Sequence, residues 1–313
     1  MRHPPYAIGS RQAPFMLSVL ALVGSSVALP AQAALPSGNL GLTSFNDGKS
    51  KPGNLFQQFV NVYEADRFMD AQGRPRPVDN ELQTTVLATF VGRITEHKVF
   101  GAWYGYEALQ PVLFANADFN PKVSTGNGLG NLSVSPVVLQ WPETTLFGRP
   151  YFQRLNLQVQ LPTGSYHRDR AINPSSNAWA FNPHYALTWE FADNWELSSR
   201  IHYLWTGRNN DPNPALATDY VQPGQALHAN VSVSRAVGQN WRLGLSGYAL
   251  KQISAERIDG RTRADSLERI SALGPAVQFG TGRTRIMVHY YKEFDAANRS
   301  EGDRLLLRWF QLF

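Results

Sequence analysis

Alternation of apolar and polar residues is the feature of this 313-residue sequence that most limits the fold it can adopt. Successive side chains of an extended strand point to opposite faces, so a period of two residues predicts strands. Between residues 194 and 204, Leu197 and Ile201 fall on one face, and Arg200 and His202 fall on the other. No segment reaches the roughly 20 continuous apolar residues that a membrane-spanning helix needs. The pattern therefore predicts an all-β chain.

Twelve segments carry this alternation, some of them less cleanly than others. They are Asn54–Asp66, Leu82–Ile94, Val99–Leu109, Leu129–Gln140, Tyr151–Leu161, Asn177–Trp189, Asn194–Leu204, His228–Val237, Trp241–Gln252, Glu268–Phe279, Thr284–Phe294 and Arg304–Phe313. An even number of strands is what single-chain bacterial barrels require.

The connections between these segments alternate in length. The short ones are Thr95–Lys98, Phe191–Asp193, Gly238–Asn240, Gly280–Arg283 and the somewhat longer Trp141–Pro150. The long polar ones are Arg67–Glu81, Gln110–Gly128, Pro162–Ser176, Thr206–Leu227, Ile253–Leu267 and Asp295–Asp303. A soluble β-sandwich would have no reason to alternate its loop lengths, whereas short periplasmic turns and long extracellular loops are typical of membrane barrels. We predict a single transmembrane antiparallel β-barrel of about 12 strands with both termini in the periplasm.

The two ends of the chain point to the same compartment. Arg2 and Arg11 precede the apolar stretch Phe15–Leu29, and Ala31-Gln32-Ala33 fits a small-x-small cleavage site, so we predict a signal peptide cleaved after Ala33. The last predicted strand contains Trp309 and ends on Phe313. A terminal Phe of this kind is the assembly signal by which the barrel assembly machinery recognises outer-membrane barrels. Gln311 departs from the aromatic that often stands two residues before the end. The signals predict localisation in the outer membrane of a Gram-negative cell.

Three units follow from this reading. Residues 1–33 are the signal peptide, residues 34–53 are an N-terminal segment, and residues 54–313 are the barrel. Ala34–Gly53 is polar and has no periodicity. The sequence leaves open whether this segment stays in the periplasm, enters the lumen or is a disordered tail.

Composition excludes several classes of function. Cysteine is absent, which excludes disulfides, a thiol nucleophile and cysteine metal sites. Loss of Arg2 and Arg11 lowers the net charge from +5 to +3, because residues 1–33 hold no acid. The remaining basic residues are scattered, so no nucleic-acid partner is expected. Eight Trp, 12 Tyr and 17 Phe suit a wall that meets lipid.

Motifs spread over most of the mature chain carry a family resemblance. They include Ala65-Asp66-Arg67-Phe68, Gly128-Leu129-Gly130-Asn131-Leu132, Leu161-Pro162-Thr163-Gly164-Ser165-Tyr166, Asn182-Pro183-His184-Tyr185, Pro223-Gly224-Gln225-Ala226-Leu227-His228 and Leu273-Gly274-Pro275. In this order and spacing the chain resembles the outer-membrane channels described as taking part in the meta-pathway of phenol degradation. The resemblance implies a twelve-stranded channel for passive uptake of small hydrophobic or aromatic compounds. The stretch from Glu256 to Asp265, after Gln252, is unusually charged. Any solute specificity that the loops of related channels carry therefore cannot be transferred to this chain.

Catalysis and metal binding find little support. No histidine is followed two residues later by serine, the compact arrangement for a nucleophile on one strand. The histidines of the strands are dispersed and give no zinc spacing, so we expect no catalytic residue, metal or cofactor. A structural or adhesive surface barrel is the main alternative function, and an outer-membrane hydrolase is a weaker one.

Polar-face residues of the predicted strands are candidates for lining the lumen. They are Arg93, Glu107, His184, Arg200, His202, Arg242, Arg285 and Arg308. They set a pore's field or pair across the lumen and fill it. Aromatic residues near strand ends are candidates for the interfacial belts: Tyr104, Tyr106, Tyr185, Trp189, Trp195, Tyr203, Tyr248 and Trp309. Expected partners are small hydrophobic or aromatic solutes, outer-membrane lipid and lipopolysaccharide, and the barrel is expected to be a monomer.

Overall fold

The structure is a computed structural model that describes residues 39–280 and 282–313. The predicted signal peptide and its cleavage site after Ala33 lie outside the described residues. Within them, no helix is long and apolar enough to span a membrane.

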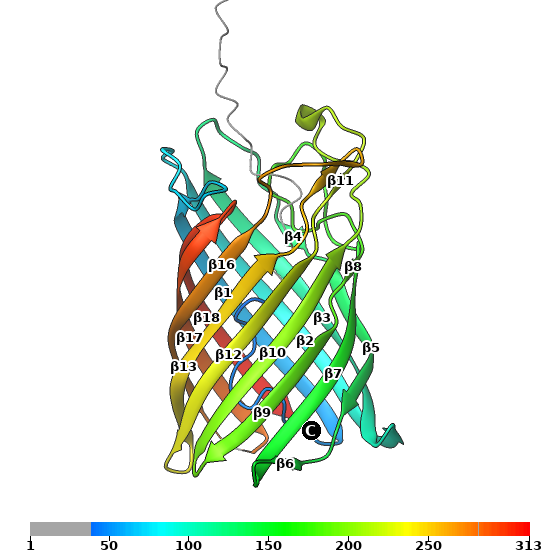
Figure 1. Ribbon diagram of the computed structural model, residues 1–313, viewed down its shortest axis with the longest axis vertical. Helices are drawn as coiled ribbons and strands as arrows, with labels where there is room; N and C mark the ends of the chain where they lie inside the picture. Colours follow the sequence, from blue (N-terminus) through cyan, green and yellow to red (C-terminus); the bar gives the residue numbers. More distant parts are fainter. Residues whose placement is uncertain (1–38, 281) are drawn as a thin grey trace, which may run out of the picture.

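Twelve long strands form one closed antiparallel barrel, which confirms the predicted fold class (Figure 1). They are β1 (Gly53–Phe68), β2 (Glu81–Val99), β3 (Ala102–Asp118), β5 (Leu132–Gln140), β7 (Arg149–Leu161), β9 (His184–Ala192), β10 (Trp195–Thr206), β12 (Ala226–Val237), β13 (Trp241–Gln252), β16 (Arg269–Phe279), β17 (Thr284–Ala297) and β18 (Ser300–Leu312). The first and last strands pair from Leu55 opposite Leu312 to Phe68 opposite Ser300, and this pairing closes the wall.

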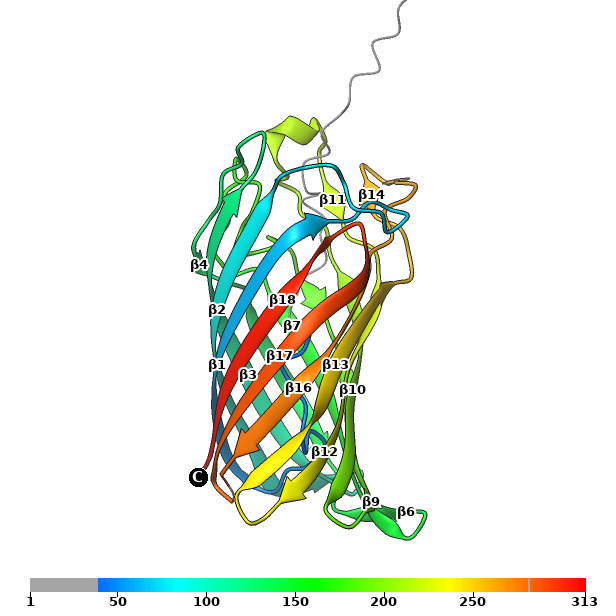
Figure 2. The ribbon, with the colours of Figure 1, turned by 90° about the vertical axis from the view of Figure 1, so that its left-hand side faces the viewer.

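Short elements lie at the two rims of the barrel. Most of the long connections gather at one rim, here called the loop end, and the opposite rim, where β1 begins and β18 ends, is the turn end (Figure 2). The short elements are β4 (Gly128–Leu129), β6 (Thr144–Leu146), β8 (Ala180–Phe181), η1 (Pro214–Leu216), β11 (Val221–Gln222), β14 (Arg257–Ile258) and β15 (Arg261–Thr262). β11, β14 and β15 form a separate small sheet in the loops.

The turn between β2 and β3 lies beyond the predicted one. Thr95–Lys98 continues the strand, and the chain reverses at Phe100 and Gly101, which have positive φ angles of 51° and 76°. A two-residue turn with both residues in this region matches the twist of a hairpin. β3 also runs past the predicted end at Leu109, because the alternation continues to outward-facing Phe114.

The predicted long loop Asp295–Asp303 is also wrong. β17 and β18 are joined by Asn298 and Arg299 alone. Asp303 pairs across the strands with Lys292, whose Nζ donates to its carboxylate at 2.8 Å, and accepts from the Tyr290 hydroxyl at 2.6 Å. These polar residues belong to a strand face, although their composition is typical of a loop.

The two faces of the wall differ as the alternation predicts. On β10, Ile201 is 50% exposed on the outside, whereas Glu196 and Ser198 are fully buried inside. Residues 39–52, called here the lumen segment, run inside the barrel before β1 begins (blue in Figure 1). The inner side chains are therefore buried against this segment as well as against one another.

Candidate functional site: the barrel interior

The first residues of the lumen segment are hydrogen-bonded to the barrel wall. The Asn230 side chain on β12 accepts from the Gly41 amide at 2.8 Å and donates to the Asn39 carbonyl at 2.7 Å. The Tyr291 hydroxyl donates to the Gly41 carbonyl at 2.9 Å. These contacts satisfy backbone groups that would otherwise be stranded away from water. They fix the segment near the middle of the barrel.

A buried acid of the segment, Asp47, anchors it to β10, where Arg200 stands opposite Asn230. Arg200 donates to the two carboxylate oxygens of Asp47, from Nε at 2.8 Å and from Nη2 at 2.6 Å. Arg154 donates to the Asp47 backbone carbonyl at 3.1 Å. The planar fork of arginine suits two-point binding of a carboxylate. Arg200 was among the predicted lumen residues, whereas Arg154 was not, although the alternation of Leu155 and Leu157 on β7 puts Arg154 on the inner face.

Glu196 forms a second anchor. Its carboxylate accepts from the Asn46 amide at 3.0 Å, from Ser198 at 2.7 Å and from Ser234 at 2.6 Å. Arg242, one of the predicted lumen residues, lies 3.7 Å from the same carboxylate. The segment is thus bound through a buried acid of the wall as well as through its own Asp47.

Glu293 gathers a third polar cluster toward the loop end. It accepts from the hydroxyls of Tyr63 at 2.8 Å and Tyr248 at 2.5 Å, and Arg304 lies 3.7 Å away. Arg304 in turn donates to the Leu40 carbonyl at 3.1 Å. The prediction that Tyr248 belongs to an interfacial belt is therefore wrong. Its ring faces the interior because Tyr248 shares the phase of buried Ser246 and Leu250 on β13.

Three histidine rings lie next to one another on the neighbouring strands β9, β10 and β12. The ring centroids of His184 and His202 are 4.5 Å apart, and those of His202 and His228 are 4.1 Å apart. The Asn182 side-chain oxygen lies 3.2 Å from a ring nitrogen of both His202 and His228. The rings of His202 and His228 are stacked, and that of His184 is tilted against His202. Within the described residues, no group of three or more acids or histidines could hold a metal ion.

The other predicted lumen residues divide between the two faces. Glu107 accepts from Asn156 at 2.6 Å, Arg308 donates to Gln57 at 2.6 Å, and the Arg285 guanidinium lies 4.0 Å from the Phe310 ring. These three point inward. Arg93 does not: it is exposed on the outer face, where it stands opposite Asn54 and Tyr106. Gly92 takes the inward position next to it, so the predicted phase of this strand is off by one residue.

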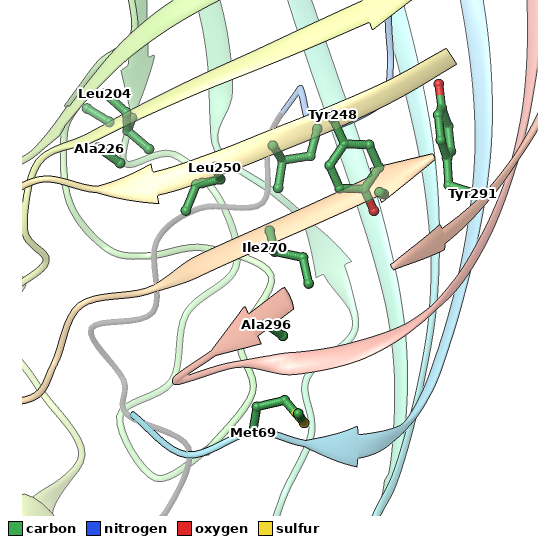
Figure 3. Close-up of a cluster of buried hydrophobic side chains, with 11 residues drawn as sticks. Met69, Leu204, Ala226, Tyr248, Leu250, Ile270, Tyr291 and Ala296 are labelled. Carbon is green, nitrogen blue, oxygen red and sulfur yellow. The ribbon is translucent and has the colours of Figure 1, made fainter. Parts of the chain in front are cut away.

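An apolar cluster fills the interior toward the loop end. Figure 3 shows Leu250 and Ile270 on the adjacent strands β13 and β16, and Leu204 beside Ala226 on the adjacent strands β10 and β12. Leu40 of the lumen segment is fully buried in the same cluster. Leu204 stands opposite Ala226, two residues beyond the His202–His228 pair, so the cluster begins next to the histidines. The cluster is Leu40, Met69, Ala180, Leu204, Ala226, Tyr248, Leu250, Ile270, Ala272, Tyr291 and Ala296.

One contact resembles part of a hydrolytic site. The Ser44 hydroxyl lies 3.3 Å from Nε2 of His289, within reach of proton transfer. Nδ1 of His289, however, lies 3.2 Å from the Ser246 hydroxyl, where a hydrolytic triad has a carboxylate. Both side chains are buried, and Ser44 belongs to the lumen segment itself.

The terminal residues lie at the seam between β1 and β18. Trp309 points outward and packs edge-on against Phe56, with 5.5 Å between the ring centroids. The Phe313 amide donates to the Asn54 carbonyl at 3.0 Å. The predicted assembly residues thus stand where the closing strand pair ends.

Comparisons with known proteins agree with this architecture. An outer membrane channel from Pseudomonas putida F1 is 14% identical and superposes with a TM-score of 0.72, covering 89% of this chain and all of the channel. The transport unit of the autotransporter AIDA-I from Escherichia coli is 9% identical with a TM-score of 0.51, covering 87% of this chain and 93% of that unit. No curated protein sequence matches. The model of the family described as "MetA-pathway of phenol degradation" matches residues 65–309, and this chain belongs to that family.

Proposed function

We propose that this protein is an outer-membrane channel for passive uptake of small hydrophobic or aromatic compounds. The apolar cluster inside the wall carries the proposal. A wide water-filled barrel keeps its interior polar, whereas Leu204, Leu250 and Ile270 present hydrocarbon to the interior. Such a lining favours transfer of apolar solutes out of water, at about 25 cal/mol per Å² buried.

The family and the fold support the same proposal. The family is named for phenol degradation, whose substrate is a small aromatic compound. The similar structure from Pseudomonas putida F1 is itself titled an outer membrane channel. We place the turn end in the periplasm and the loop end outside the cell, with a signal peptide cleaved after Ala33. The barrel inserts through the barrel assembly machinery, sits as a monomer among outer-membrane lipid and lipopolysaccharide, and is not an enzyme.

The lumen segment adds a condition to transport. Leu40 is fully buried within the cluster, and Asp47 is bound by Arg200 further along the interior. A solute that crosses the interior must therefore displace part of the segment. The same closure favours the alternative, a structural or adhesive barrel that only displays its loops, so transport itself has to be measured.

Uptake by cells tests the proposal. Cells that express the protein should take up a labelled monoaromatic hydrocarbon faster than cells with an empty vector, while uptake of a sugar stays unchanged. Leu204→Asn should remove the gain, because it makes the cluster polar. The matched control Leu227→Asn alters an outward-facing leucine on the neighbouring strand and should keep the gain. Equal uptake by wild type and empty vector would favour the adhesive alternative.

A further inference from the structure

A recess of about 650 Å³ lies on the wall at the turn end, where β1, β2, β3 and β5 run side by side. The wall is irregular at this place. The register between β3 and β5 shifts between Gly105 and Glu107, and the register between β5 and β7 shifts between Val134 and Val137. Pro136 lies within the second shift and has no amide to donate to a neighbouring strand. The two register shifts interrupt the regular strand pairing beside the recess.

Two rows of outward-facing residues line the recess. The row nearer the bilayer centre is apolar and runs across four strands as Phe56, Val91, Ala108 and Val134, each opposite the next. The row nearer the rim runs as Asn54, Arg93 and Tyr106. The small side chain of Ala108 leaves space between Val91 and Val134 on either side of it. The recess is thus lined by apolar residues on the side of the bilayer centre and by polar residues on the side of the rim.

Arg93 stands at the polar edge without a protein partner. Among the described residues, no hydrogen bond or ion pair joins its guanidinium to another group, and the residue is exposed. Two other cations of the outer surface are paired with acids: Lys292 with Asp303 at 2.8 Å and Arg149 with Asp193 at 2.9 Å. An unpaired guanidinium beside an apolar recess complements an anionic head on an apolar chain.

The recess lies at the depth of a membrane interface. Phe56 packs against Trp309, and both are outward-facing aromatic residues near the turn end of the barrel. Trp and Tyr gather at this level in membrane proteins because their rings are partly apolar and partly polar. Arg93 lies one row closer to the rim, the depth at which basic side chains reach lipid phosphates.

We propose that this recess binds one glycerophospholipid of the periplasmic leaflet, with its phosphate on Arg93 and an acyl chain along the row from Phe56 to Val134. The proposal rests on the turn end facing the periplasm, and it does not depend on solute transport. The bound lipid fills the recess, and its phosphate pairs with the guanidinium of Arg93.

Native mass spectrometry tests the site on the full mature protein. Phosphatidylglycerol is added to protein in non-ionic detergent, and bound lipids are counted. Arg93→Gln should weaken the tightest lipid site about five- to tenfold, the effect of losing one cation near a phosphate. Ala108→Phe, which fills the floor without changing charge, should remove that site. Arg93→Lys should restore binding in part.

Arg235→Gln is the matched control. Arg235 is an exposed, outward-facing arginine of the same rim, but it lies beside the Trp195 ring and is not among the residues that line this recess. Its variant should bind phosphatidylglycerol like the wild type. Heat-modifiable migration in detergent electrophoresis shows whether each variant is folded. Folded Arg93→Gln that binds lipid as tightly as Arg235→Gln would overturn the proposal, whatever the uptake assay shows.

Discussion

Arg200 of β10 binds Asp47 of the lumen segment through two hydrogen bonds of 2.6 and 2.8 Å, so that two residues far apart in the chain join the segment to the wall. Both side chains are buried, and Arg154 lies against the same aspartate. A charge-assisted pair in a low-dielectric interior is costly to break from one side, because the remaining charge is left unpaired. This pair therefore ties the segment to the wall.

Asp47→Asn should loosen the lumen segment. The substitution leaves Arg200 and Arg154 without their anion, at a cost of up to about 3–5 kcal/mol for a buried pair. We expect higher single-channel conductance in planar bilayers and a shift toward anion selectivity. Asp66→Asn, on an exposed residue of β1, removes one acid outside the interior and should leave both unchanged. Identical traces from the two variants would show that Asp47 does not hold the segment.

A charge placed on the outer face should act according to its depth. Ile201 lies about halfway along β10 and is half exposed on the outside. Ile201→Arg should lower the free energy of unfolding in lipid vesicles by about 2–4 kcal/mol, the cost near a bilayer midplane. Val237→Arg, at the turn-end rim of β12, should cost only about 0–1 kcal/mol. Equal costs at the two positions would mean that β10 does not cross the bilayer in this register.

Deleting Phe313 should impair assembly. Its amide bonds to Asn54 at the closing seam, and its ring ends the strand that carries the assembly signal. We expect slow insertion and protease-sensitive protein in the periplasm, measured by fractionation and by migration of unboiled samples. Normal amounts in the outer membrane would show that the residues up to Leu312 suffice as the signal.

Two loop carboxylates should respond to pH in opposite directions. Burial raises the pKa of Glu256, although Arg263 opposes the shift. The charged form is therefore disfavoured in the ordered loop, so order there should fall as pH rises through and above the ordinary value of 4.5. The backbone amide of Arg74 lowers the pKa of Asp70, so the order of its turn should be present above 3.8 and be lost below it.

Hydrogen exchange, corrected for its intrinsic pH dependence, measures both loops at once. Acidification from neutral pH toward 4.5 should increase protection of residues 253–268. Glu256→Gln removes the titrating group and should abolish that change. A loss of protection around Glu256 on acidification would reverse the sign and contradict the assignment.

The sequence predicted the barrel well because its information is periodic. On β10 and β12 the apolar phase is unbroken, and the structure buries Glu196, His202 and His228 on the opposite face. The phase was lost where the pattern weakens. In the segment around Arg93, Gly92 has no side chain to mark a face, and the prediction placed Arg93 on the wrong one.

The interior contacts could not be predicted in the same way. Asp47 lies in a polar stretch without periodicity, and its pairing with Arg200 joins residues that only the closed barrel brings together. The same holds for Tyr248, whose hydroxyl finds Glu293 across the interior and turns an apparent belt residue into an inner one. Strand registers follow local rules, whereas these pairings depend on the whole cylinder.

Tethering the lumen segment tests most directly whether solutes cross the interior past it. Asn230 donates to the Thr43 hydroxyl at 2.8 Å, and the chain has no native cysteine, so Thr43→Cys with Asn230→Cys offers a single disulfide between segment and wall. Cells with the oxidised variant should lose the gain in uptake of a labelled monoaromatic hydrocarbon and regain it after reduction. Each single-cysteine variant should behave alike under both conditions. Equal uptake by the oxidised and reduced double variant would contradict passage through the interior.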